Sequence, residues 1–145
     1  MIREIVEDDI GTLVQYGKFF WTKTPYVTAG MEYNPGYVAE MLQTLKDDHY
    51  LRVYEVDGEI VGVIGFYLVP FPFNPNYKLA HEIFFFVHPG HRGAIGKELL
   101  EQAERDLADK VDIVTLGDML SSTDMNDYYT QRGYTLSERA YTKVI

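Results

Sequence analysis

Residues 83–87 carry five apolar side chains in succession, Ile-Phe-Phe-Phe-Val. Successive side chains of a β-strand point to opposite faces of its sheet, so a strand with this sequence is apolar on both faces. Such a strand belongs in the interior of a sheet that is covered on both sides. We therefore predict a strand over residues 77–87, in a sheet with helices on its faces.

Other strands are predicted before and after this one. Two of them, at residues 50–56 and from 59 or 60 to 69, are expected to form a hairpin. The pair Asp57-Gly58 lies between them, and both residue types tolerate the positive φ of a tight hairpin turn. The remaining strands are predicted at residues 2–5, 112–116 and 134–145.

Four helices are predicted from apolar spacing and from residues that favour helix ends. The second shows both signals, since Asn34 is a good cap, Pro35 suits the first helical position, and apolar residues from Val38 to Leu45 recur at helical spacing. The helices are predicted from Asp8 or Asp9 to about Trp21, from Asn34 past Leu45, from Ile95 to about Lys110, and from Ser122 or Thr123 to Gln131.

Together these elements predict one α/β (α+β) domain over residues 1–145. We expect a central mixed sheet, mostly antiparallel, of six to seven strands with about four helices on its faces. A chain of 145 residues has the usual length of a single domain.

Charge and composition limit the classes of partner. The formal net charge of −9 has the wrong sign for binding a phosphate backbone. The absence of cysteine excludes disulfides, cysteine-based zinc sites and a thiol nucleophile. Residues 1–5 lack the features of a signal peptide, and the longest apolar stretch, residues 60–73, is interrupted by glycine and proline. We therefore expect a cytoplasmic protein that binds neither nucleic acid nor membranes.

The segment from Val87 to Leu100 predicts a strand that passes through a glycine-containing turn into a helix. Gly93 and Gly96 let a ligand approach the backbone, and the N–H groups at a helix N-terminus attract an anion. A pyrophosphate group would suit this turn. Glycine is also common in simple strand-to-helix connections, so the residues alone leave open a turn without a ligand.

This segment resembles the acetyl-CoA-binding motif of the GNAT superfamily of N-acetyltransferases. In that family a Val-x-Pro strand end precedes Arg/Gln-x-x-Gly-x-Gly/Ala and a helix that starts with two leucines. Val87 and Pro89 match the strand end, whereas His91 falls at the Arg/Gln position and Ala94 at the first glycine, counted back from Gly96. The resemblance implies an acetyl-CoA site formed by Phe86, Val87, His91, Arg92, Gly93, Ala94, Ile95, Gly96 and Lys97.

A second segment, residues 128–134, resembles the Tyr-x-x-x-Gly-Phe sequence of the same family, with Tyr129 at the tyrosine position and Tyr134 in place of phenylalanine. In the family this tyrosine is the general acid that protonates the thiolate of CoA, and a phenol has the proton to give. The alternative for Tyr129 is a buried aromatic residue that anchors a helix to the sheet.

The candidate general base is Glu82, since many members of the family place a base on this strand. A carboxylate in a partly apolar cleft has a raised pKa and accepts a proton from an ammonium group near neutral pH. The alternative is a strand residue that faces solvent, with His81 on the opposite face.

The expected activity is N-acetyl transfer from acetyl-CoA to a primary amine of a small molecule or peptide, by direct transfer in a ternary complex. No metal is expected, because His81, His88 and His91 do not have the spacing of a known metal site. An amine pocket would have as candidate walls the aromatic residues of 21–26 and the segment 70–75. A homodimer would have residues 141–145 as its candidate edge. The alternatives are a non-catalytic acyl-CoA-binding or interaction domain on the same fold, and an unrelated nucleotide- or phosphate-binding protein.

Overall fold

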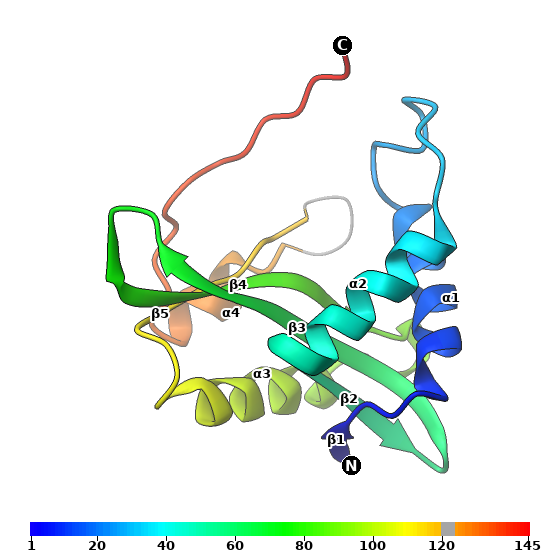
Figure 1. Ribbon diagram of the computed structural model, residues 1–145, viewed down its shortest axis with the longest axis horizontal. Helices are drawn as coiled ribbons and strands as arrows, with labels where there is room; N and C mark the ends of the chain where they lie inside the picture. The colour runs from blue at the N-terminus through cyan, green and yellow to red at the C-terminus, as the bar shows by residue number, and fades with distance from the viewer. Residues whose placement is uncertain (120–123) are drawn as a thin grey trace.

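The computed structural model describes residues 1–119 and 124–145, and Figure 1 shows their arrangement. The helices and strands are, in chain order, β1 (Ile2–Glu4), α1 (Asp9–Trp21), α2 (Pro35–Asp48), β2 (Tyr50–Val56), β3 (Glu59–Phe71), β4 (Asn74–Val87), the short 3-10 helix η1 (Pro89–His91), α3 (Ala94–Leu107), β5 (Ile113–Thr115) and α4 (Asn126–Gln131).

The sheet has five strands within the described ranges, in the order β1-β2-β3-β4-β5. Strands β1 to β4 are antiparallel neighbours, and β5 runs parallel to β4. The predicted mixed, mostly antiparallel sheet is therefore confirmed. The Asp57-Gly58 turn is also confirmed, because both residues have positive φ values, 50° and 82°.

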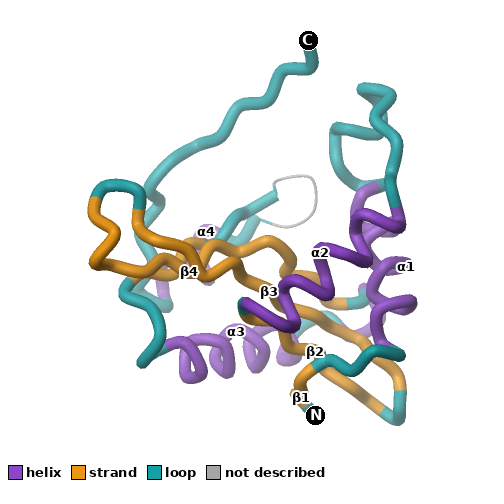
Figure 2. Tube along the Cα trace, viewed as in Figure 1, coloured by secondary structure: helices purple, strands orange, loops and turns teal. Residues whose placement is uncertain are grey.

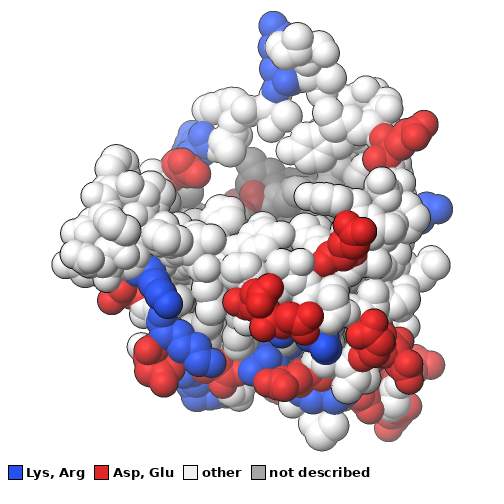
Figure 3. Space-filling model, in the orientation of Figure 1, with Lys and Arg blue, Asp and Glu red and all other residues white. Residues whose placement is uncertain are grey.

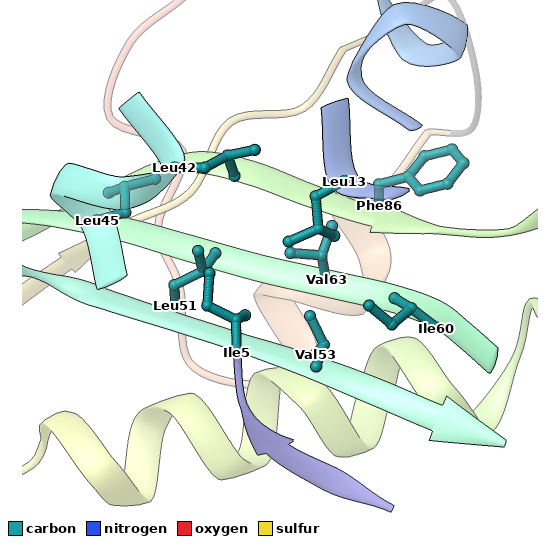
Figure 4. Close-up of a cluster of buried hydrophobic side chains, with 9 residues drawn as sticks. All are labelled: Ile5, Leu13, Leu42, Leu45, Leu51, Val53, Ile60, Val63 and Phe86. Carbon is teal, nitrogen blue, oxygen red and sulfur yellow. The ribbon is translucent and has the colours of Figure 1, made fainter. Parts of the chain in front are cut away.

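Helices cover both faces of this sheet, as the run of apolar residues in β4 predicts (Figure 2). Helices α1 and α2 pack on one face, where Figure 4 shows a cluster of buried side chains between them and the strands. Helix α3 packs on the other face, and its core contacts come from a second set of buried residues: Tyr50, Ile64, Phe66, Ala80, Leu99, Leu100, Ala103 and Leu107. Within the described ranges, each helix is too short or too polar to span a lipid bilayer.

The first two helices begin in different ways. Asn34 caps α2 as predicted, since its side chain accepts a hydrogen bond from the N–H of Tyr37 at 3.0 Å, and Pro35 takes the first helical position. Asp8 precedes α1 but makes no capping hydrogen bond. Asp9 instead lies inside the first turn, where it is buried and forms an ion pair with Arg3.

The predicted strands at residues 134–145 are wrong. This segment has no strand structure, and after the half-buried Tyr134 it continues as an exposed tail (Figure 1). The edge strand β5 has only three residues and is too short to pair with this segment along its length. The sheet therefore has five described strands instead of six to seven, and dimer formation through residues 141–145 stays a prediction. The predicted start of α4 at Ser122 or Thr123 lies outside the described residues.

Candidate functional site

The candidate site lies where β4 and β5 separate. The two strands are paired over residues 79–81 and 113–115, and this pairing ends at His81 and Thr115. Strand β4 continues beside β3 as far as Val87, which lies opposite Gly62. A β-bulge interrupts this pairing just after Glu82, and such a bulge bends a strand. Among the described residues, the second half of β4 therefore has a strand neighbour on one side only.

The backbone N–H groups of this half of β4 alternate in direction. The N–H of His88 donates to the carbonyl of Val61 at 2.8 Å, on the β3 side. Because bonding directions alternate along an antiparallel strand, the N–H groups of Val87 and Phe85 point away from β3. They face the side on which β5 has ended, so they are available to a ligand in the gap between the strands.

Glu82 lies at the point where the strands separate. Its side chain is half-buried, and its Oε2 atom accepts a hydrogen bond from the backbone N–H of Gly117 at 2.8 Å. The pKa of Glu82 is raised to about 7, mainly by burial, and the net value includes a lowering by the Gly117 hydrogen bond and a raising by the negative charge of Asp118. A carboxyl group with a pKa near 7 exchanges a proton readily at neutral pH, as a general base must.

Tyr129 approaches the same place from helix α4. Its ring lies 5.9 Å from the rings of both Tyr128 and Tyr134, and it packs on the core cluster under α3. Burial raises the pKa of Tyr129 above that of free tyrosine, and the negative charges of Glu82 and Asp118 raise it further. The phenol is therefore protonated at neutral pH and close enough to Glu82 to experience its charge.

Helix α4 has only six residues and is held in place by charged contacts with α3. Arg132, directly after the helix, forms an ion pair with Glu101 at 3.1 Å and a second one with Glu104. The hydroxyl of Tyr134 donates to Glu104 at 2.8 Å. These contacts fix the short helix that carries Tyr129 to the longest helix on this face.

The turn after β4 has the features of an anion site. Gly93 precedes α3 with a φ of 117°, and no side chain caps the first N–H groups of this helix. Gly96 lies in the first turn of α3, packed against the side chains of Val87 and Phe85. The N–H groups of residues 94–96 lie in the first turn of this helix, where the helix dipole attracts negative charge.

The side chains of the other predicted cofactor residues have different environments. Phe86 is buried against α1, with its ring 5.8 Å from that of Tyr16, and by the same alternation its backbone N–H faces β3. The predicted role of Phe86 in cofactor binding therefore has no support from its position. Ile95 is half-buried, and Lys97 forms an ion pair with Glu101 at 3.8 Å. His91 and Arg92 are exposed on the turn, as is Ala94.

The candidate amine-pocket residues are at the periphery. Trp21 at the end of α1 lies 5.8 Å from Tyr33, ring to ring. Phe73 at the tip of the β3–β4 hairpin is 90% exposed. Figure 3 shows a hollow in this face of the molecule, with mostly uncharged side chains around it. Across the residues that the structure describes, no three metal-binding side chains come together.

Sequence reasoning missed Gly117, Asp118 and Arg132. Gly117 and Asp118 directly follow the predicted strand 112–116, and a glycine with a charged residue in the loop after a strand is a signal that favours a site. The role of Arg132 depends on its contacts with another helix, which the local sequence does not reveal.

Comparisons with known proteins indicate the family and the fold. Residues 17–134 match the family model described as the acetyltransferase (GNAT) family. A transcriptional regulator from Bacillus halodurans C-125 has a similar structure, with a TM-score of 0.78 and 20% identity over 100% of this chain and 99% of that one. A ribosomal-protein-alanine N-acetyltransferase from Brucella melitensis biovar Abortus 2308 is similar with a TM-score of 0.74 and 19% identity, over 100% and 99%.

A predicted acetyltransferase from Clostridium acetobutylicum, solved with acetyl-CoA, has a TM-score of 0.73 and 15% identity over 99% of this chain and 95% of that one. At these identities the similarity supports the fold. The search of curated protein sequences gave no match.

Proposed function

The chain belongs to the acetyltransferase (GNAT) family, and from this premise we propose that it transfers an acetyl group from acetyl-CoA to the primary amine of a small molecule or peptide. The family supports acyl transfer in general. The amine acceptor, the use of acetyl-CoA and the roles of Glu82 and Tyr129 are parts of the proposal.

The residues present suit acetyl-CoA, which supplies an activated acyl group and carries phosphate groups through which a protein can bind it. The uncapped N-terminus of α3 and the open space over Gly93 suit the pyrophosphate. The N–H groups of Phe85 and Val87, which point away from β3, suit the polar groups of an extended arm in the gap beside β4. Arg92 lies on the turn and forms no ion pair within the described ranges, whereas Lys97 is paired with Glu101. Its positive charge is therefore the one that suits a phosphate group.

In the proposed mechanism, Glu82 accepts the proton that the amine loses as its nitrogen bonds to the acyl carbon. The N–H of Val87 or Phe85 stabilises the negative charge on the acyl oxygen. Tyr129 donates its phenolic proton to the sulfur as the carbon–sulfur bond breaks. Glu82 then releases its proton to solvent and Tyr129 regains one, which restores the starting state. Glu82, with its pKa of about 7, and the protonated Tyr129 thus begin in the states that these roles require.

A single observation carries this proposal: two titratable side chains from different elements lie beside the half of β4 that pairs with β3 but not with β5, close enough for the charge of Glu82 to raise the pKa of Tyr129. One is a carboxyl group whose pKa lies near neutrality, and the other is a phenol that holds its proton. Such a pair is typical of acid–base chemistry on a bound substrate.

The test is an acetyl-CoA turnover assay with a panel of primary amines, read by a thiol reagent that detects released CoA. Because the chain has no cysteine, the reagent reports CoA alone. We expect kcat/KM to rise about tenfold per pH unit up to the Glu82 pKa of about 7, then to level off. Glu82→Gln should lower kcat by about 100-fold or more and leave acetyl-CoA affinity, measured by calorimetry, within about twofold.

The alternatives predict different results. Acetyl-CoA binding without turnover for any amine would favour a non-catalytic acyl-CoA-binding domain. Binding of ATP in preference to CoA species would contradict the proposal altogether.

A further inference from the structure

The backbone conformation at position 117 does not explain why a glycine occurs there. Four glycines of the described residues have positive φ, namely Gly30, Gly58, Gly93 and Gly133, and Gly117 is not among them. A Cβ atom built on Gly117 would lie 3.1 Å from Oε2 of Glu82, closer than an ordinary van der Waals contact. The absence of a side chain therefore lets the backbone approach the carboxyl group of Glu82 closely.

The Gly117 N–H also replaces a strand contact. Main-chain pairing between β4 and β5 ends at His81 and Thr115, one residue before Glu82 and two before Gly117. Just beyond the last paired residues, the Gly117 N–H donates a hydrogen bond to the Glu82 side chain at 2.8 Å. The carboxyl group is thus held across the opening between the strands, with one oxygen fixed to the chain that follows β5.

The next residue links this contact to helix α4. Oδ2 of Asp118 accepts a hydrogen bond from the N–H of Met125 at 3.0 Å. The carbonyl of Met125 in turn accepts from the N–H of Tyr129 at 2.9 Å. A continuous chain of hydrogen bonds and peptide units therefore runs from the Glu82 carboxyl group to the backbone of Tyr129.

We propose that Gly117 and Asp118 are positioning residues that hold the carboxyl group of Glu82 and the phenol of Tyr129 on the same reacting atoms. Gly117 acts through its N–H and its missing side chain, and Asp118 acts through Met125. This inference rests on the proposed acyltransferase function. It adds the requirement that Gly117 and Asp118 align the general acid and base.

Gly117 and Asp118 have opposite electrostatic effects on the carboxyl group of Glu82. Asp118 contributes a negative charge from the segment after β5, and Tyr129 a protonated phenol from α4. Strand β3 contributes the apolar Phe66, opposite Glu82 in the pairing. The Gly117 N–H stabilises the carboxylate, whereas the Asp118 charge destabilises it, so the loss of each should move the pKa of Glu82 in opposite directions.

The first experiment measures the pKa of the Glu82 carboxyl group by NMR in protein with carbon-13-labelled glutamate, assigned with Glu82→Gln. Gly117→Ala should push the carboxyl group off the N–H and raise its pKa by about half a unit to one unit. Asp118→Asn keeps an acceptor for Met125 but removes the charge, and should lower the pKa by a similar amount. A structural role alone would not produce shifts of opposite sign.

The second experiment compares kcat in Asp118→Asn and Asp118→Ala. Both lack the charge, but only the alanine variant loses the acceptor for Met125. We expect kcat of Asp118→Ala to be about tenfold below that of Asp118→Asn, since misplacement of a catalytic group has effects of this size or larger. Gly11→Ala, which adds a side chain in open space, and Asp109→Asn, on an exposed turn, are the matched controls.

The outcomes separate this proposal from the proposed function. Unchanged Glu82 pKa values in both variants, or equal kcat for Asp118→Asn and Asp118→Ala, would overturn the positioning roles. The NMR titration does not depend on turnover. Opposite pKa shifts in a protein that acetylates no amine would support the positioning of Glu82 by Gly117 and Asp118. They would overturn the acyltransferase proposal instead.

Discussion

The two halves of β4 have different neighbours. From Leu79 to His81 the strand is paired on both sides, with β3 and β5, and Ala80 is fully buried there. From Glu82 to Val87 its one strand partner within residues 1–119 and 124–145 is β3. The first half is an ordinary interior strand, whereas the second leaves backbone N–H groups and a titratable side chain at an opening.

This difference shows how one strand serves both stability and chemistry. Interior pairing satisfies the backbone groups and leaves nothing to bind a ligand. Where β5 ends, the same strand offers unpaired N–H groups beside Glu82, and the turn to α3 adds further donors. The candidate site thus arises from an interruption of the sheet, and substitutions on either side of His81 should have effects of different kinds.

The largest effect is expected in the doubly paired half. Ala80→Asp would place an unpaired charge at a position with no exposed surface and should lower the free energy of unfolding by about 3–5 kcal/mol. Urea denaturation measures this loss. Lys78→Ala, at an exposed position of the same strand, should change it by less than about 0.5 kcal/mol. A tolerated Ala80→Asp would remove the distinction between the two halves.

On the open side, Tyr129→Phe should affect turnover and leave stability nearly unchanged. It keeps the ring but removes the proton donor, so kcat should fall by about 100-fold. The matched control is Tyr128→Phe, since the buried hydroxyl of Tyr128 has no hydrogen-bond partner within the described ranges. Its removal should leave kcat unchanged and the protein equally or more stable. Equal kcat values in the two variants would assign Tyr129 a packing role only.

A substitution in the turn after β4 should change the affinity for acetyl-CoA. Gly93→Ala forces a side chain onto a backbone with a φ of 117°, which reshapes the turn and should weaken acetyl-CoA binding about tenfold in calorimetry. Gly30→Ala strains a glycine with a φ of 79° in another loop, far along the chain, and should leave affinity unchanged. If both variants bind alike, the turn is only a connection.

The smallest expected effect is on the pH dependence of stability. The pKa of Glu82 rises from 4.5 to about 7 on folding, so the folded state favours the neutral acid. Stability due to this group is fully present below pH 4.5 and is lost as the pH rises to 7. Relative to Glu82→Gln, the wild-type protein should therefore lose about 1 kcal/mol over this range, a value reduced by partial exposure. A constant difference between the two unfolding curves would contradict the raised pKa.

The sequence by itself determined the local elements. The Asp57-Gly58 turn, the Asn34-Pro35 helix start and the doubly apolar run in β4 each depend on residues within one turn or one strand, so their physics is visible in the sequence. The strand–turn–helix before Leu99 and the tyrosine of residues 128–134 also identified the family and two candidate catalytic residues.

Only the tertiary structure decided which groups meet. That β5 ends opposite His81, that the Gly117 N–H reaches Glu82, and that Arg132 fixes α4 to α3 are contacts between segments 28 to 35 residues apart. The predicted C-terminal strands were wrong for the same reason: a strand needs a partner edge, and β5 is too short to offer one. Local sequence fixes conformation, but pairing, burial and pKa depend on distant neighbours.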